Sequence, residues 1–442
     1  MYSLRLLAFA LFAVCLATRA EALVRINLTE ANNNPMPIAV TDLAGESADE
    51  KRLGHEIKEV VKANLTDTGL FAPINDKAFL QSDTSLKDNG PVFSEWRLIN
   101  TEAVVVGSVE YLDHGADPKV RVVYRMYDVH EEKQMIAKAY TSNLSFWRHI
   151  AHRISDDIYS QITGEGPYFA TRIVYIGEDQ VRGMRVLRKR LCIMDQDGGN
   201  NQCLTDGRNL VLTPRFSPTV QQIIYMSYAN GQPRLYLLDL PTGKQEILGD
   251  FPGLNSSPRF SPDGKSVAMT LTMGHEGNPE VYTMDLKSRE LKRLTFHRGI
   301  DTSPSFSPDG KYIVFNSDRS GKPELYIMDK DGNKVRRLTY GEGRYYAPVW
   351  SPRGDLIAFV KSANGKFNIG VIDPKGEEER LLTDSFMDES PSWSPNGRVI
   401  IFAREDRNGR TRMRTIDLTG YNERELPTPT DASDPAWSPL LQ

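Results

Sequence analysis

The sequence predicts a mainly β protein in which a small α/β (α+β) domain precedes a C-terminal six-bladed β-propeller. Two observations lead to this prediction. A five-residue motif recurs six times at nearly constant spacing, and the region before the first copy mixes helical and strand patterns without containing the motif. We therefore expect a leader over residues 1–22, a first domain over residues 23–166 and a propeller over residues 167–442.

The repeated motif is Pro-x-Phe/Trp-Ser-Pro, and successive copies lie 44, 46, 44, 43 and 44 residues apart. A repeat of this length that contains four short strands is typical of a propeller blade. In the third copy we expect strands at 303–307, 312–316, 324–329 and 335–339, joined by tight Asp-Gly turns. The copies begin at Pro214, Pro258, Pro304, Pro348, Pro391 and Pro435.

The two ends of this array determine the blade number. Three residues follow the sixth copy, so its strand lacks three partners. Segments matching those partners lie at 173–175, 191–195 and 204–205. The C-terminal strand should therefore join the first blade and close a six-bladed ring with no open edge.

Two residue types recur within the repeat, and both favour structural roles. An Asp ends each third strand just before a turn, which favours turn capping over ligand binding. An aromatic residue occupies each first strand, which favours packing between blades over a cofactor site. The acids are Asp195, Asp239, Asp285, Asp329, Asp373 and Asp417, and the aromatics are Phe216, Phe260, Phe306, Trp350, Trp393 and Trp437.

The first domain is predicted from periodicity. Residues 49–64 and 146–162 place apolar side chains at helical spacing. Short strands are expected at 24–28 and 38–40, and a longer pair at 103–111 and 120–127. This mixture indicates a small layered α/β or α+β fold.

The first residues resemble a cleavable secretory signal. Arg5 precedes an apolar run of about 12 residues, too short to span a bilayer, and small residues follow at Ala20 and Ala22. A lipoprotein signal at Cys15 is disfavoured because the bulky Val14 precedes it. The formal net charge of -4 and the lack of a basic run argue against a nucleic-acid partner.

Cys192 and Cys203 flank Asp197-Gly198, a strong hairpin signal that would place the two cysteines opposite each other. In an oxidising compartment this spacing favours a disulfide, and the alternative is two buried thiols.

The sequence lacks recognisable catalytic chemistry. His55-Glu56 is followed by Glu59 where a zinc-peptidase helix needs a second His, and no Gly-x-Ser-x-Gly turn is present. His149 and His152 lie one helical turn apart, but no third ligand is evident, so we interpret them as surface residues. We expect no enzyme activity, no metal and no cofactor. A cation in the propeller channel would have no support in the sequence.

The longer, variable connections fall at one end of the predicted ring, where we expect function to reside. They carry apolar residues among polar ones, a pattern that suits a protein partner. The alternative is that several of them plug the channel mouth. The candidates are Leu254, Asn255, Ser257, Phe296, His297, Asp301, Thr302, Tyr345, Tyr346, Phe386, Met387, Asp388 and Glu389.

Signal, leading α/β domain, six Ser-Pro-Asp-Gly-type blades and a closing Trp437-Ser438-Pro439 together resemble the TolB family, the periplasmic propellers of the Tol-Pal system. The resemblance implies that the propeller mouth binds the outer-membrane lipoprotein Pal, with Leu254, Asn255, Ser257 and Thr302 at the matching positions. Leu254 departs from members that carry His there, so the interface would differ in detail.

The resemblance also implies that the segment after the leader, residues 23–34, binds the inner-membrane protein TolA. Its first residues alternate apolar and polar, so they could dock as an edge strand or add to a partner's sheet. An ordinary strand within the first domain is the alternative. The residues concerned are Leu23, Val24, Arg25, Ile26, Asn27 and Leu28.

The sequence thus favours a monomeric periplasmic scaffold that reaches both membranes through its partners. Its expected role is to link TolA to Pal and so support outer-membrane integrity and invagination during cell division. A propeller enzyme of hydrolase type or a lectin-like ligand-binding protein is the alternative.

Overall fold

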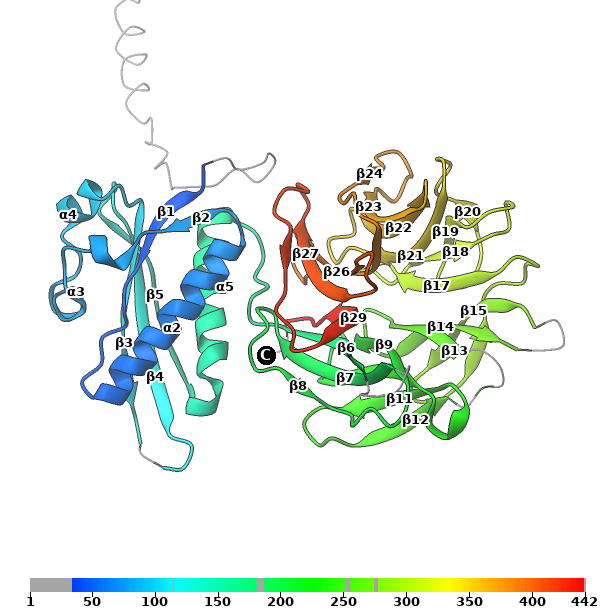
Figure 1. Ribbon diagram of the computed structural model, residues 1–442, viewed down its shortest axis with the longest axis horizontal. Coiled ribbons are helices and arrows are strands. Elements are labelled where there is room, and N and C mark those ends of the chain that lie inside the picture. Colours follow the sequence, from blue (N-terminus) through cyan, green and yellow to red (C-terminus); the bar gives the residue numbers. More distant parts are fainter. Residues whose placement is uncertain are drawn as a thin grey trace, which may run out of the picture.

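The computed structural model describes residues 34–113, 115–180, 187–249, 251, 255–273 and 277–440. A domain of helices and one sheet lies beside a ring of small sheets (Figure 1). The predicted leader and the predicted strand over residues 24–28 fall outside the described residues. Among those described, no helix is both long enough and apolar enough to cross a bilayer.

The first domain has a five-stranded sheet in the order β2-β1-β3-β4-β5, with β1 parallel to both of its neighbours. The remaining strands form an antiparallel meander. Its last strand, β5, was not predicted because most of its side chains are exposed and apolar alternation is weak. The strands are β1 (Met36–Val40), β2 (Phe71–Pro73), β3 (Ala103–Tyr111), β4 (Lys119–Asp128) and β5 (Lys133–Asn143).

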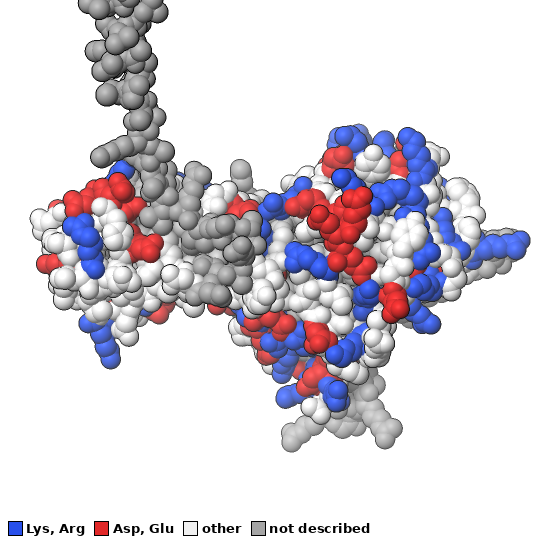
Figure 2. Space-filling view, turned by 90° about the horizontal axis from the view of Figure 1, so that it is seen from above, with Lys and Arg blue, Asp and Glu red and all other residues white. Residues whose placement is uncertain are grey.

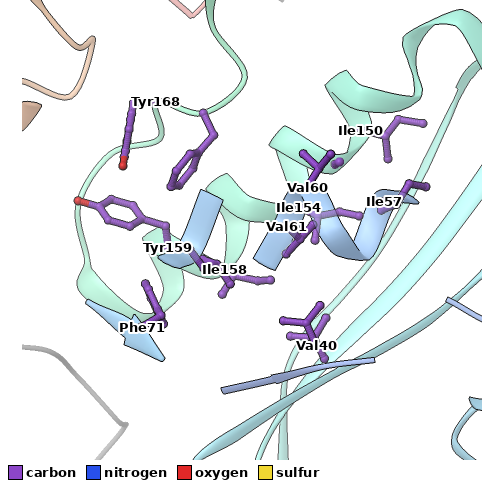
Figure 3. Close-up of a cluster of buried hydrophobic side chains, with 14 of the residues drawn as sticks. Val40, Ile57, Val60, Val61, Phe71, Ile150, Ile154, Ile158, Tyr159 and Tyr168 are labelled. Carbon is purple, nitrogen blue, oxygen red and sulfur yellow. The ribbon is translucent and has the colours of Figure 1, made fainter. Parts of the chain in front are cut away.

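Both predicted helices are present and lie on the side of the sheet that faces the propeller (Figure 1). Ser47 and Glu50 form a capping box that starts the first of them. Their apolar faces meet, with Ile57 directed toward Ile154 above the sheet (Figure 3). The helices are α2 (Ala48–Asp67), α3 (Asp83–Asn89), α4 (Phe93–Leu98) and α5 (Trp147–Thr163), with 3-10 turns η1 (Asp76–Ala78) and η2 (Leu144–Phe146).

Beside this domain (Figure 1), the described residues form six four-stranded meanders, as the repeat predicts. The fifth and sixth share one sheet because Phe367 pairs with Met387. A 3-10 turn, η3 (Ala229–Gly231), lies in the second blade. The strands are β6 (Arg172–Gln180), β7 (Leu187–Asp195), β8 (Gln202–Cys203), β9 (Val211–Phe216), β10 (Gln222–Ser227), β11 (Arg234–Asp239), β12 (Gln245–Gly249), β13 (Asn255–Phe260), β14 (Ser266–Thr272), β15 (Pro279–Asp285), β16 (Leu291–Arg293), β17 (Asp301–Phe306), β18 (Tyr312–Ser317), β19 (Glu324–Asp329), β20 (Arg336–Arg337), β21 (Arg344–Trp350), β22 (Ile357–Ala363), β23 (Lys366–Ile372), β24 (Arg380–Leu381), β25 (Met387–Trp393), β26 (Val399–Glu405), β27 (Thr411–Asp417), β28 (Arg424–Glu425) and β29 (Asp431–Trp437).

The C-terminal strand closes the ring, as predicted, by pairing antiparallel with β6. The buried indole Nε1 of Trp437 donates to Thr171 Oγ1 at 2.7 Å, and its ring meets Tyr168 edge-on at 6.1 Å. The closing strand therefore also holds the segment that leads out of the first domain.

Each blade's first strand contains a bulge that the sequence analysis did not foresee. The residue before the motif's first Pro has a φ between 46° and 54°, and the pairing with the second strand shifts there in all six blades. Non-glycine residues reach this region only when their surroundings impose it. The six are Thr213, Ser257, Ser303, Ala347, Ser390 and Asp434.

The repeated Asp caps its own turn in five blades, where it accepts backbone N–H groups of the turn. Asp195 of the first blade instead accepts from two side chains, those of Asn200 in its own turn at 2.8 Å and Arg148 on α5 at 3.4 Å. The repeated aromatics all lie in hydrophobic clusters between strands. In the first blade, a disulfide joins Cys192 to Cys203, which face each other on β7 and β8.

Candidate functional site

Strand pairing places the predicted functional loops at one end of the ring, here called the mouth. In the fourth blade, Ser317 at the end of β18 pairs with both Asp301 and Glu324, which begin β17 and β19. First-strand starts, second-strand ends and third-strand starts therefore share this end. The tight turns lie at the opposite end, where Tyr312 pairs with Asp329.

Large aromatic side chains are exposed at the mouth. Phe296 is 75% exposed, Tyr340 is 72% exposed and Phe386 is 45% exposed. Phe296 and Tyr340 follow the fourth strands of neighbouring blades, in the equivalent sequences Leu-Thr-Phe and Leu-Thr-Tyr. Apolar groups of this size among polar neighbours are typical anchors of protein interfaces.

Two of these rings are held in place by arginines. The Arg293 guanidinium lies 4.7 Å from the centre of the Phe296 ring, and Arg337 lies 4.6 Å from that of Tyr340. Arg293 donates to Glu280 at 2.8 Å, while Arg337 donates to Glu324 at 2.7 Å. Both carboxylates are buried and accept a further hydrogen bond from a threonine. Such a fixed platform lowers the entropy cost of binding.

The polar and half-buried candidates surround these rings. His297 is exposed, and its Nδ1 accepts from Gly299 N at 2.9 Å, which orients the ring. Thr302, Tyr346 and Met387 are half-buried on first strands. These four residues remain candidate contacts.

Three candidates are not exposed loop residues, and that expectation was wrong for them. Asp301, Tyr345 and Asp388 lie on first strands and are fully buried. They occupy the same repeat position, two residues before the bulge. On these strands, the side chain at this position is buried within the blade, whereas that of the next residue, such as Tyr346, lies nearer the surface.

The buried candidates act as braces beneath the mouth. Asp301 accepts from Arg319 at 2.7 Å, and burial raises the pKa of its carboxyl despite this cation. Asp388 accepts hydrogen bonds from Nε and from one Nη of Arg404, at 2.6 and 2.9 Å. Burial raises the pKa of Tyr345 to about 12, and its hydroxyl donates to Glu379 at 2.8 Å.

Two of the remaining candidates lie on β13, the first strand of the third blade. Asn255 begins this strand, and Ser257 is its bulge residue, with φ +52°. Leu254 lies outside the described residues, as do the N-terminal candidates Leu23, Val24, Arg25, Ile26, Asn27 and Leu28.

Sequence reasoning missed Tyr340, although its equivalence to Phe296 in the repeat was a usable signal. It was also wrong to place His152 on the surface. His152 is 2% exposed and lies between the two domains, close to Asp195 and Asp197. Among the described residues, these three form the group whose side chains are close enough to share a metal ion.

Charged side chains of both signs are interspersed on the propeller surface shown in Figure 2, where an acidic patch is bordered by basic groups. Mixed charges of this kind are common in the polar surroundings of protein interfaces.

Comparison with known families covers both parts of the chain. Residues 24–135 match the family model described as the TolB amino-terminal domain, and residues 159–441 match the TolB beta propeller domain. The chain belongs to the TolB family. The fold class predicted from the repeat and from the leading domain is thereby confirmed.

Two relatives support this assignment. A Tol-Pal system protein TolB from Paramagnetospirillum magneticum is 50% identical over 229 residues, which cover 52% of this chain and 50% of that protein. This match spans about half the length of the relative. The crystal structure of TolB from Acinetobacter baumannii superimposes with a TM-score of 0.81 at 31% identity, covering 94% of this chain and 99% of that one.

Proposed function

We propose that this TolB-family chain is a monomeric, non-enzymatic scaffold of a Tol-Pal system, exported to the periplasm. It links a TolA-like inner-membrane protein to a Pal-like outer-membrane lipoprotein and so supports envelope integrity and invagination during cell division. Family membership across both domains supports the Tol-Pal assignment.

The observation that carries the binding role is the set of exposed aromatics at the mouth. Phe296, Tyr340 and Phe386 would enter apolar pockets of a Pal-like partner, with His297, Thr302, Tyr346 and Met387 contributing around them. The arginine and carboxylate pairs beneath two of the rings keep them presented before binding. Leu254, Asn255 and Ser257 would extend this surface along the first strand of the third blade, the blade that also carries Phe296.

The second partner would bind the segment that precedes the first domain, residues 23–34. The apolar and polar alternation of these residues suits addition to a partner's sheet. The segment leads directly into β1, so such a complex would form beside the first domain rather than at the mouth.

Pull-down from an envelope extract tests the two halves separately. The intact mature chain should capture a peptidoglycan-associated lipoprotein and an inner-membrane Tol protein. Deleting residues 23–34 should remove the second alone, and the double change Tyr340→Asp and Phe386→Asp should remove the first alone. Tyr421, 79% exposed beside a tight turn at the opposite end, provides the matched control Tyr421→Asp. Retention of the lipoprotein by the mouth variant would contradict the proposal.

A further inference from the structure

A buried histidine with an unpartnered nitrogen lies where the two domains meet. His152 on α5 is 2% exposed, and its Nδ1 lies 2.9 Å from Asn64 Nδ2. Its Nε2 is directed at the first propeller hairpin, 3.6 Å from Asp195 Oδ2 and 3.9 Å from Asp197 Oδ1. Among the described residues, this Nε2 has no hydrogen-bond partner.

These distances suit a shared cation better than a direct hydrogen bond. An N–H···O bond normally spans about 2.7–3.2 Å, so both gaps are too long. Donors bound at about 2.0–2.1 Å to a tetrahedral zinc ion lie roughly 3.4 Å apart. We propose that His152, Asp195 and Asp197 form a divalent-cation site, best suited to Zn²⁺, that joins α5 to the first blade.

The groups behind the histidine can orient it as a ligand. A metal on Nε2 requires a proton on Nδ1, with an acceptor facing it. Asn64 would supply that acceptor if its amide oxygen and nitrogen exchanged places, a rotation that leaves the shape of the side chain unchanged. Gln196 now donates to Asn64 Oδ1 at 2.8 Å, and its own buried Oε1 has no hydrogen-bond partner. If the Gln196 amide exchanged its oxygen and nitrogen as well, Asn64 would donate to that oxygen, and Ser155 Oγ, which now accepts from Asn64 Nδ2 at 2.9 Å, would become the donor.

The local charge also favours a cation. The two carboxylates contact one guanidinium, that of Arg148, and Arg172 lies further along the wall of the adjoining cavity. Arg148 bonds Asp197 through Oδ2, whereas Oδ1, which accepts from Gly199 N at 3.0 Å, is the oxygen nearer His152. Asp195 Oδ2 accepts from Asn200 Nδ2 at 2.8 Å and from Arg148 Nε at 3.4 Å, and a bound cation would take the place of the longer of these contacts.

An adjoining cavity provides a way in and room for a fourth ligand. Its volume is about 330 Å³, and its wall includes His149, His152, Asp195 and Asn200. Three protein ligands and one open position filled by water would complete a tetrahedral zinc site.

Cobalt titration of the untagged, chelator-treated mature chain tests the site. We expect one Co²⁺ to bind per chain with the visible absorption of tetrahedral coordination, and Zn²⁺ to displace it. His152→Gln, Asp195→Asn and Asp197→Asn should each abolish this signal. His55→Gln is the matched control, because His55 also faces a carboxylate, Asp42 at 2.9 Å, but is exposed. Circular dichroism identifies any variant that fails to fold.

A fourth variant separates a metal site from a simple ion-pair network. Arg148→Gln removes the competing cation, so it should tighten metal binding by about tenfold or more. Absence of saturable binding in both the wild type and Arg148→Gln would overturn the proposal, as would unchanged binding in folded His152→Gln and Asp195→Asn variants. The site does not depend on the proposed Tol-Pal function.

Discussion

Replacing Asp388 by Asn tests whether the buried acids of the mouth are braces or partner contacts. Asp388 is fully buried and binds Arg404 through both of its oxygens. The Arg404 side chain is 21% exposed and also binds Glu423 at 2.6 Å. The substitution keeps the shape of the side chain but removes one of the two carboxylate charges that contact the guanidinium.

The size of the effect follows from this environment. Breaking a buried ion pair by removing one partner costs about 3–5 kcal/mol. The partial exposure of Arg404 and its remaining bond to Glu423 place this case at the lower end, about 3 kcal/mol. With a urea dependence of about 3 kcal/mol/M, the midpoint of propeller unfolding should fall by about 1 M.

Urea unfolding followed by tryptophan fluorescence measures this shift, and a binding assay on the same samples below the transition measures the contact. We expect Asp388→Asn to unfold earlier and, while folded, to bind nearly as well as the wild type. Phe386→Ala should show the reverse pattern. Unchanged stability combined with lost binding in Asp388→Asn would refute the role as a brace.

Three further predictions concern other parts of the molecule. The double change Cys192→Ala and Cys203→Ala opens a loop with a sequence separation of 11 and should reduce stability by about 3 kcal/mol in calorimetry. Asp76 binds the buried Lys58 at 2.7 Å. Burial raises the pKa of the Asp76 carboxyl, but its two lysine partners lower that pKa by more, so the net shift is downward. Asp76→Asn should therefore destabilise the protein at pH 7, and this destabilisation should disappear as the pH falls below about 4. Asp373→Ala removes the acceptor of four turn N–H groups and should cost about 1 kcal/mol in urea unfolding.

Each of these predictions can be contradicted by a specific result. For the disulfide, that result is a double variant whose melting temperature matches that of the wild type in oxidising buffer. The Asp76 prediction would be contradicted by a stability difference from wild type that does not shrink as the pH is lowered from 4 toward 2, because the carboxylate's contribution is present above its unfolded pKa and disappears as the pH falls through the lower folded value. For Asp373, that result is a midpoint indistinguishable from that of Asp373→Asn.

The ring could be predicted because its evidence is local and repeated. Each Pro-x-Phe/Trp-Ser-Pro copy marks one first strand, and the unpaired copy at residues 435–439 requires partners at the other end of the repeat. The strand β5 gave no comparable signal, since its exposed side chains weaken the alternation.

Which mouth residues face outward could not be predicted, because the bulge is imposed by pairing with the second strand. Tyr345 and Tyr346 were both expected in a loop, whereas both lie on β21, which buries the first and leaves the second half-buried. His152 was misplaced for a related reason. Its neighbours Asp195 and Asp197 are more than forty positions away in sequence and meet it only when the domains pack.

The affinity of the mature chain for the soluble domain of a Pal-like lipoprotein is the most direct test of the central claim, that exposed aromatics at the mouth bind a protein partner. Isothermal titration should show that Phe296→Ala and Phe386→Ala each weaken binding by about 1–2 kcal/mol, or roughly tenfold. Tyr421→Ala should leave the affinity unchanged. Equal affinities for all four proteins would contradict the claim.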